Sequence, residues 1–190
     1  RIFLLRSAMR AHRNALYWPA VAADRPTICT TAIPGYMKAN RPSKTGAMTA
    51  SLNEILETFE FLDDWEDRYK YLIDLGKDLP ELSTDEKNEQ NKVRGCVSQV
   101  WLITSVDKAP DGAPVLTFRG DSDALIVQGL VAIVTAIFSG KPATEILATD
   151  VEAIFAELGL QDHLTPQRSN GLRSMVGRIR ADAQQALEAA

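Results

Sequence analysis

The stretch GCVSQVWLITSVDKAPDGAPVLTFR, residues 95–119, decides the fold of this chain. Residues 97–106 are rich in Val, Ile, Thr and Trp with apolar side chains on both faces, which predicts a strand covered on both sides. Residues 107–112 have the Asp, Pro and Gly content of a turn, and residues 115–119 are predicted to form the antiparallel partner strand. A cysteine, Cys96, stands where a loop enters the first strand.

Helical patterns flank this hairpin on both sides. Apolar spacing, capping residues and helix-ending Gly or Pro predict helices at residues 52–62, 64–76, 124–138, 143–147, 151–158 and 166–179. Residues 77–91 are charged and predict an exposed loop, and a third strand is allowed before Cys96. The sequence therefore predicts an α+β fold in which a small antiparallel sheet of about three strands packs against helices.

Charge is distributed unevenly along the chain. Residues 1–47 hold eight Lys or Arg against one acid, which gives +7, and the total of −4 leaves −11 for residues 48–190. The regular patterns begin at Met48. We interpret residues 1–47 as a basic, disordered extension, either a product of upstream translation or an organellar presequence, and residues 48–190 as the domain. Nucleic-acid binding by this arm is a weaker alternative, because a diffuse charge of +7 without an aromatic-interleaved patch is little evidence for it, and we predict no nucleic-acid partner.

The apolar content gives no reason to expect a membrane protein. The most apolar run, residues 124–138, is shorter than a bilayer span and contains Gln128, which predicts a buried helix. No secretory signal is present, and Cys29 and Cys96 are the only cysteines, which is typical of a reducing compartment. We expect a cytoplasmic protein, or a plastid or mitochondrial one if residues 1–47 are a presequence.

Cys96 is the only thiol of residues 48–190, so within this domain it cannot form a disulfide or a site with several cysteine ligands. Gly95 is expected to leave room for an approaching partner. Lys92 and Arg94 are expected to favour the thiolate. The alternative is a buried cysteine that serves as a small hydrophobic residue, and spacing alone leaves both open.

Four motifs, in order, resemble one known family. GCVSQVW at residues 95–101 resembles the G-C-x-S-Q-V-W signature of the SufE family, the sulfur-acceptor proteins of iron–sulfur cluster assembly. The other three are Trp65 and Tyr69 followed by LG at 75–76 and LP at 79–80, GDSDA at 120–124, and HLTPQRSNGL at 163–172. Together they extend over residues 52–179.

The resemblance implies a SufE/IscU-like fold and a role as a sulfur relay. A cysteine desulfurase that uses pyridoxal phosphate, SufS-like or CsdA-like, would hold sulfur as a persulfide, and Cys96 would accept the outer sulfur by an exchange like that of thiols with disulfides. The carrier would activate that enzyme, pass the sulfur to a SufBCD-like scaffold, and need no cofactor or metal of its own. It would not turn over independently, and a monomer and a homodimer are both compatible with it.

Several residues near the motifs are expected to support Cys96 or bind the partner. Ser98 is given a structural role, and Gln99 either a structural role or one around the thiol. Asp121 and Asp123 are predicted to cap the apolar helix, with partner contact as the alternative.

Two more supporting residues lie in the last motif. Arg168, in the first turn of the last helix, is expected to form a salt bridge or a partner contact, because a cation there is disfavoured by the helix dipole. His163 is either a proton donor to Cys96 or a cap or loop residue before that helix.

Other classes of thiol protein need residues that can be looked for in the sequence. A cluster scaffold of the IscU type needs about three cysteines, and this domain has one. A cysteine hydrolase would pair Cys96 with His163 but lacks a recognisable oxyanion-hole motif. A redox-sensing thiol, a CsdE-like carrier for a paralogous desulfurase and a pure binding module stay open.

Overall fold

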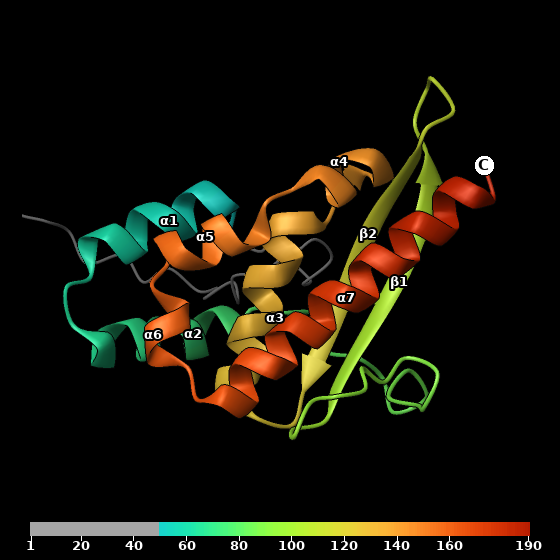
Figure 1. The fold of residues 1–190 in the computed structure, drawn as a ribbon. Helices are drawn as coiled ribbons and strands as arrows, with labels where there is room; N and C mark the ends of the chain where they lie inside the picture. The colour runs from blue at the N-terminus through green and yellow to red at the C-terminus, as the bar shows by residue number, and fades with distance from the viewer. Residues whose placement is uncertain (1–49) are drawn as a thin grey trace, which may run out of the picture. The chain divides into compact units, whose positions relative to one another are not determined.

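A computed structural model describes residues 50–190, and the predictions for residues 1–47 and Cys29 lie outside them. In chain order the elements are α1 (Leu52–Phe61), α2 (Trp65–Lys77), β1 (Val100–Lys108), β2 (Pro114–Ser122), α3 (Leu125–Phe138), β3 (Lys141–Pro142), α4 (Ala143–Ala148), α5 (Val151–Glu157), α6 (Leu160–His163) and α7 (Pro166–Glu188) (Figure 1). The fold is α+β with a three-stranded antiparallel sheet, which confirms the predicted class.

The sheet has the order β1-β2-β3, and the long β1–β2 hairpin is its main part. Val100 lies opposite Ser122 and Lys108 opposite Pro114. β1 therefore begins three residues later and ends two residues later than the predicted strand at residues 97–106, and β2 is longer than the predicted strand at residues 115–119. β3 pairs with Val115 and Leu116 of β2 and follows α3. The third strand is therefore not before Cys96, where the structure has only an isolated bridge between Lys92 and Trp101.

Helices cover one face of the hairpin, and α7 runs along β1 (Figure 1). Val100 and Leu102 point into the core on this face, and Thr104 Oγ1 donates a hydrogen bond to Asp182 of α7 at 2.5 Å. On the second half of β1, residues 105–108 are exposed. The prediction that the first strand is covered on both sides is therefore wrong for that half, because β1 extends past the helical layer.

α2 and α3 cross with their backbones in contact. A Cβ at Gly129 would lie 2.1 Å from the carbonyl oxygen of Leu72, and a Cβ at Gly76 would lie 2.8 Å from the backbone nitrogen of Gly129. Gly76 lies inside the last turn of α2, one residue before the end at Lys77, so close helix packing accounts for it better than the predicted helix end. The crossing fixes α3, the most apolar helix, at the centre of the core.

The capping predictions succeed in part. Asp64 caps α2 by accepting a hydrogen bond from the backbone N–H of Glu66, as expected. α7 begins with Thr165 at the cap position and Pro166 next, although the Thr165 side chain makes no capping bond. α3 has Ala124 at its cap position and no side-chain cap, so the prediction that Asp121 and Asp123 cap this helix is wrong.

No helix within residues 50–190 combines the length and apolar character that a bilayer crossing requires.

Candidate functional site

Cys96 lies in a loop held by a short hairpin stem. The backbone N–H of Val93 donates to the carbonyl of Val100 at 2.8 Å, and the N–H of Leu102 donates to the carbonyl of Asn91 at 2.7 Å. These two bonds enclose the isolated bridge, and residues 94–99 form the loop between the paired segments. The stem anchors the entry and exit of the loop to β1 and leaves the thiol between them.

Gly95 gives the loop its entry turn. Its φ is +93°, in the region that favours glycine, and a Cβ there would lie 2.6 Å from Ser174 Oγ of α7. The structure therefore explains Gly95 by backbone conformation and contact with α7. The clearance that Gly95 was expected to give an approaching partner stays a prediction.

The exit of the loop is clamped to the end of β2. Asp123 Oδ1 accepts a hydrogen bond from the backbone N–H of Gln99 at 2.9 Å, while Ser122 Oγ donates to the Gln99 carbonyl at 2.8 Å. The N–H of Asp123 donates to the same carbonyl at 3.2 Å. Gln99 thus contributes through its backbone, and Asp123 holds the thiol loop rather than the helix.

Asp121 holds the charged loop that precedes the hairpin stem, on the other face of the sheet. Its carboxylate is 4% exposed, accepts from Gln128 Nε2 at 3.0 Å and forms an ion pair with Lys87 at 2.7 Å. The Lys87 ammonium also lies 5.7 Å from the centroid of the Trp101 ring, so the loop before the stem is tied to β1 and β2 together. Sequence reasoning missed Lys87, because nothing distinguishes it within a charged loop.

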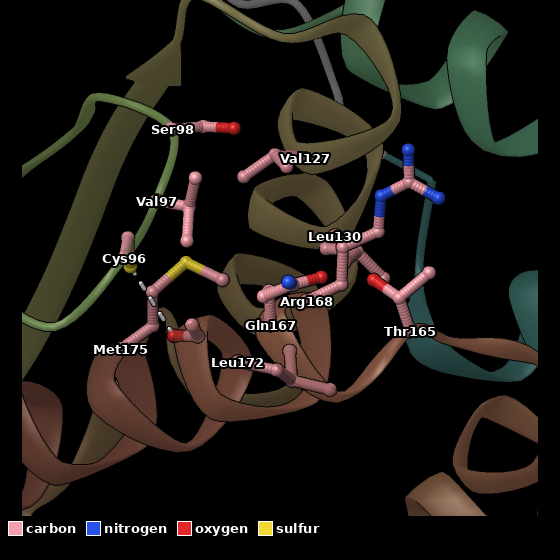
Figure 2. Close-up of a pocket in the computed structure, with 11 residues that line it drawn as sticks. Cys96, Val97, Ser98, Val127, Leu130, Thr165, Gln167, Arg168, Leu172 and Met175 are labelled. Carbon is pink, nitrogen blue, oxygen red and sulfur yellow. Dashed lines mark hydrogen bonds between the residues drawn. The ribbon is translucent and has the colours of Figure 1, made fainter.

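The thiol itself is half-buried against α7. Cys96 Sγ donates to the carbonyl oxygen of Gly171 at 3.5 Å, and it lies at a cavity of about 280 Å³ (Figure 2). The cavity is lined by the thiol loop, α3 and the start of α7: Cys96, Val97, Ser98, Val127, Leu130, Thr165, Gln167, Arg168, Gly171, Leu172 and Met175. An extra atom bonded to Sγ could be accommodated there without displacing the core.

Burial raises the pKa of the Cys96 thiol. The predicted stabilisation of the thiolate by Lys92 and Arg94 is therefore wrong for this arrangement. Arg94 is exposed and lines a separate groove with Ser174 and Arg178, and Lys92 pairs with Glu89. Burial therefore favours the protonated, less nucleophilic form of the thiol.

The structure does not bring His163 to Cys96. Its ring stacks on Trp65 with 3.8 Å between ring centroids, and its carbonyl accepts a hydrogen bond from the Tyr69 hydroxyl. His163 ends α6 and packs the α6–α7 corner onto α2, which is the structural alternative given above. The pairing that a cysteine hydrolase needs is therefore not formed.

Among the other predicted residues, Ser98 and Arg168 line the cavity beside Cys96. Figure 2 shows the Arg168 side chain rising from α7 on the far side of the cavity from Cys96. Arg168 takes part in none of the ion pairs of residues 50–190, so the expected salt bridge is not formed within the described residues. Sequence reasoning missed the roles of Gly171 and Met175, although both fall on the helical face that carries the last motif.

Within residues 50–190 no cluster of three or more His, Cys, Asp or Glu side chains could hold a metal ion. Within these residues a single thiol, that of Cys96, is presented by a clamped loop over a cavity on an α+β scaffold. Residues 53–183 match the family described as SufE, Fe-S metabolism associated domain, so the chain belongs to the SufE family and is associated with iron–sulfur metabolism.

Individual relatives agree with this assignment. The chain is 59% identical over 134 residues to an uncharacterised SufE-like protein of Rhizobium etli, covering 70% of this chain and 90% of that protein. It is 56% identical over 140 residues to an uncharacterised SufE-like protein of Rhizobium meliloti, covering 73% and 99%. The solution structure of a hypothetical protein from Thermus thermophilus shares the fold, with a TM-score of 0.57 at 21% identity over 72% of this chain and 96% of that one.

Proposed function

We propose that this protein is a sulfur acceptor for iron–sulfur cluster assembly that carries sulfane sulfur as a persulfide on Cys96. The observation that carries the proposal is the position of the Cys96 sulfur at a cavity of about 280 Å³, on a loop clamped at both ends. A carrier needs one thiol, space for one more sulfur atom and partial burial of the resulting persulfide. The Cys96 thiol and the cavity beside it meet these three requirements.

The reaction is an exchange at sulfur. The Cys96 thiol loses its proton, and its thiolate attacks the outer sulfur of a persulfide on the active-site cysteine of a cysteine desulfurase. A bond forms between Cys96 Sγ and the sulfane sulfur, and the bond between that sulfur and the desulfurase cysteine breaks. The desulfurase thiolate leaves with the electron pair and takes up a proton, so no oxidant or reductant is consumed.

The partner regains its free thiol in this step, which is why the carrier would accelerate the desulfurase without turning over by itself. The donor is a SufS-like or CsdA-like enzyme that uses pyridoxal phosphate, and the sulfur passes on to a SufBCD-like scaffold. The two donors have the same chemistry, so the proposal covers a CsdE-like carrier as well.

The state of the thiol supports a carrier more than a peroxide sensor. A sensor cysteine is typically an exposed thiol of low pKa, whereas burial raises the pKa of Cys96 and its Sγ–H donates to Gly171. For a carrier, a protonated and half-buried resting thiol limits reactions with the wrong electrophile until a donor is present.

The test uses the full chain with a cysteine desulfurase, pyridoxal phosphate and free cysteine, followed by alkylation and peptide mass spectrometry. We expect one additional sulfur on the peptide that contains Cys96, in wild type and in Cys29→Ser alike, and none in Cys96→Ser. Peptide mapping separates the two cysteines. Transfer that persists in Cys96→Ser, or that is absent from wild type, would refute the proposal.

A further inference from the structure

β1 is an edge strand of the sheet, and its outer side is paired over only part of its length. β2 lies on one side of β1, and on the other side the hairpin stem bonds to Val100 and Leu102. Hydrogen-bonding groups of a strand alternate between its two sides, so those of Thr104, Val106 and Lys108 also point outward. No backbone hydrogen bond within the described part of the chain reaches these three residues from that side.

Residues 104–108 form what we call the open edge, and most of the features that usually protect an edge strand are absent from it. The ladder with β2 is continuous from Val100 to Lys108, so no bulge bends the edge away. The edge contains no Pro, and its charged side chains, Asp107 and Lys108, are confined to its end. A row of outward N–H and C=O groups of this kind is a template for another strand.

A groove of about 450 Å³ lies beside the open edge, between β1 and the last turns of α7, which run next to the end of β1 (Figure 1). It is larger than the cavity at Cys96. Val106 lines it and is 53% exposed, and Ala186 and Ala189 line it from α7. Small side chains on the helix and an exposed apolar side chain on the strand leave space for apolar groups of a partner.

Lys108 carries the uncompensated charge of this groove. Arg178 and Asp182 also line it, but Arg178 Nε donates to Asp182 Oδ1 at 2.9 Å, and Thr104 Oγ1 donates to Asp182 Oδ2 at 2.5 Å. Lys108 takes part in none of the ion pairs of the described residues. Because side chains alternate along a strand, Val106 and Lys108 lie on the same face of β1, so the groove offers an apolar contact and a cation two positions apart.

We infer that the open edge binds an extended segment of another protein, which adds to the sheet as a strand beside β1. Backbone hydrogen bonds to residues 104–108 supply the affinity, and side chains that alternate into the groove supply the specificity. The charge and the apolar contact determine the chemistry of the segment: an acidic side chain for Lys108 and an apolar one for Val106. These two side chains stand two positions apart, since one face of a strand carries every second residue.

This inference goes beyond sulfur transfer and does not depend on it. Val106 lies six residues along β1 from Val100, and a strand rises about 3.3 Å per residue, so the open edge is roughly 20 Å from the end of the thiol loop. A segment bound at the edge therefore leaves Cys96 free to react. The protein can hold this partner and exchange sulfur at the same time.

The test uses a phage-displayed library of random peptides of about eight residues, a typical strand length, selected on the full chain under reducing conditions. We expect enrichment of peptides with an acidic and an apolar residue two positions apart. Selection on Lys108→Glu should enrich a basic residue in place of the acidic one. Selection on Lys77→Glu, the same charge change at an exposed position of α2, should enrich acidic peptides as wild type does.

The enriched peptide then tests the backbone contacts. Bound to the full chain, it should slow amide hydrogen exchange at Thr104, Val106 and Lys108. Val106→Pro removes an outward N–H, leaves the ladder with β2 intact and keeps an apolar side chain, so it should raise the dissociation constant by about tenfold or more. Val106→Leu keeps the N–H and should bind as wild type does. Urea unfolding checks that both variants are folded, and the charge exchange at Lys108 stands as a test if Val106→Pro is not.

Several outcomes would overturn the inference. These are a selection without enrichment, acidic peptides that persist on Lys108→Glu, equal binding to Val106→Pro, and unchanged exchange at the three amides. Slow exchange without peptide would mean that another part of the chain occupies the edge, and a dimer in sedimentation that Val106→Pro abolishes would mean that a second copy does. Either result also overturns it, and none of these outcomes bears on sulfur transfer to Cys96.

Discussion

The thiol of Cys96 and the backbone of Gly171 are in direct contact: Sγ donates to the Gly171 carbonyl oxygen at 3.5 Å, and a Cβ at position 171 would lie 3.2 Å from Sγ. The absence of a side chain at Gly171 therefore allows the thiol to rest against α7. The contact joins two motifs that are 75 residues apart in the sequence.

Replacing Gly171 should move the thiol. In Gly171→Ala the methyl group is expected to push Cys96 Sγ away from α7, so iodoacetamide should alkylate Cys96 several-fold faster than in wild type. Gly177→Ala is the matched control, because a Cβ at Gly177 on the same helix would meet nothing within 4 Å. It should only stabilise the protein, by about 0.5–1 kcal/mol in urea unfolding. Equal alkylation rates for Gly171→Ala and wild type would contradict the contact.

Asp123 should restrain the exit of the thiol loop. Asp123→Ala removes the acceptor of the Gln99 N–H and should cost about 1 kcal/mol of stability. It should also speed amide hydrogen exchange at Gln99. Asp111→Ala is the control, since Asp111 makes the same kind of bond to the Ala113 N–H at the remote hairpin turn. If both variants leave exchange at Gln99 unchanged, the clamp does not restrain the loop.

The α2–α3 crossing should tolerate no side chain. Gly129→Ala places a methyl group against the Leu72 backbone, which cannot rotate away as a side chain would. We expect a loss of about 3 kcal/mol or more in the free energy of unfolding, measured by urea denaturation, against a small gain for Gly177→Ala. A Gly129→Ala protein as stable as wild type would mean that the helices do not approach this closely.

Burial of the thiol should appear in its pH dependence. Because burial raises the pKa of Cys96, alkylation of the folded Cys29→Ser protein should rise at a higher pH than alkylation of the same protein unfolded in urea.

The same shift has a consequence for stability. The folded state retains the Cys96 proton where the unfolded state has lost it, so this contribution is complete below the unfolded-state pKa and disappears as the pH rises through the folded-state pKa. Cys96→Ser should therefore lose less stability than wild type as the pH rises through that alkaline range. Identical alkaline stability profiles would show that the thiol is not buried.

The sequence predicted the elements whose signals are local. The β1–β2 hairpin, the positions of α1 to α5 and the cap of α2 by Asp64 follow from periodicity, turn residues and capping residues over a few positions. Cys96 was identified because it is the only thiol of the domain and lies in a specific motif.

Contacts distant in sequence could not be predicted. Asp121 and Asp123 have the spacing of capping residues, but the β1–β2 ladder continues to Ser122 and gives them other partners, Lys87 and the Gln99 N–H. The sequence allowed His163 to approach the thiol, but in the structure its ring stacks on Trp65. The resting burial of Cys96 depends on α7, which no pattern near the cysteine describes.

The hairpin stem sets how far the sulfur can travel. Val93 and Val100 are hydrogen-bonded to each other, so Cys96 is tethered by three residues on one side and four on the other. A fully extended chain covers roughly 3.3–3.6 Å per residue, so Cys96 can extend at most about 10 Å beyond the stem. Under the proposed function, a donor cysteine would therefore have to lie within that depth of its own protein surface, so the short loop would reach shallow active sites and not deep ones.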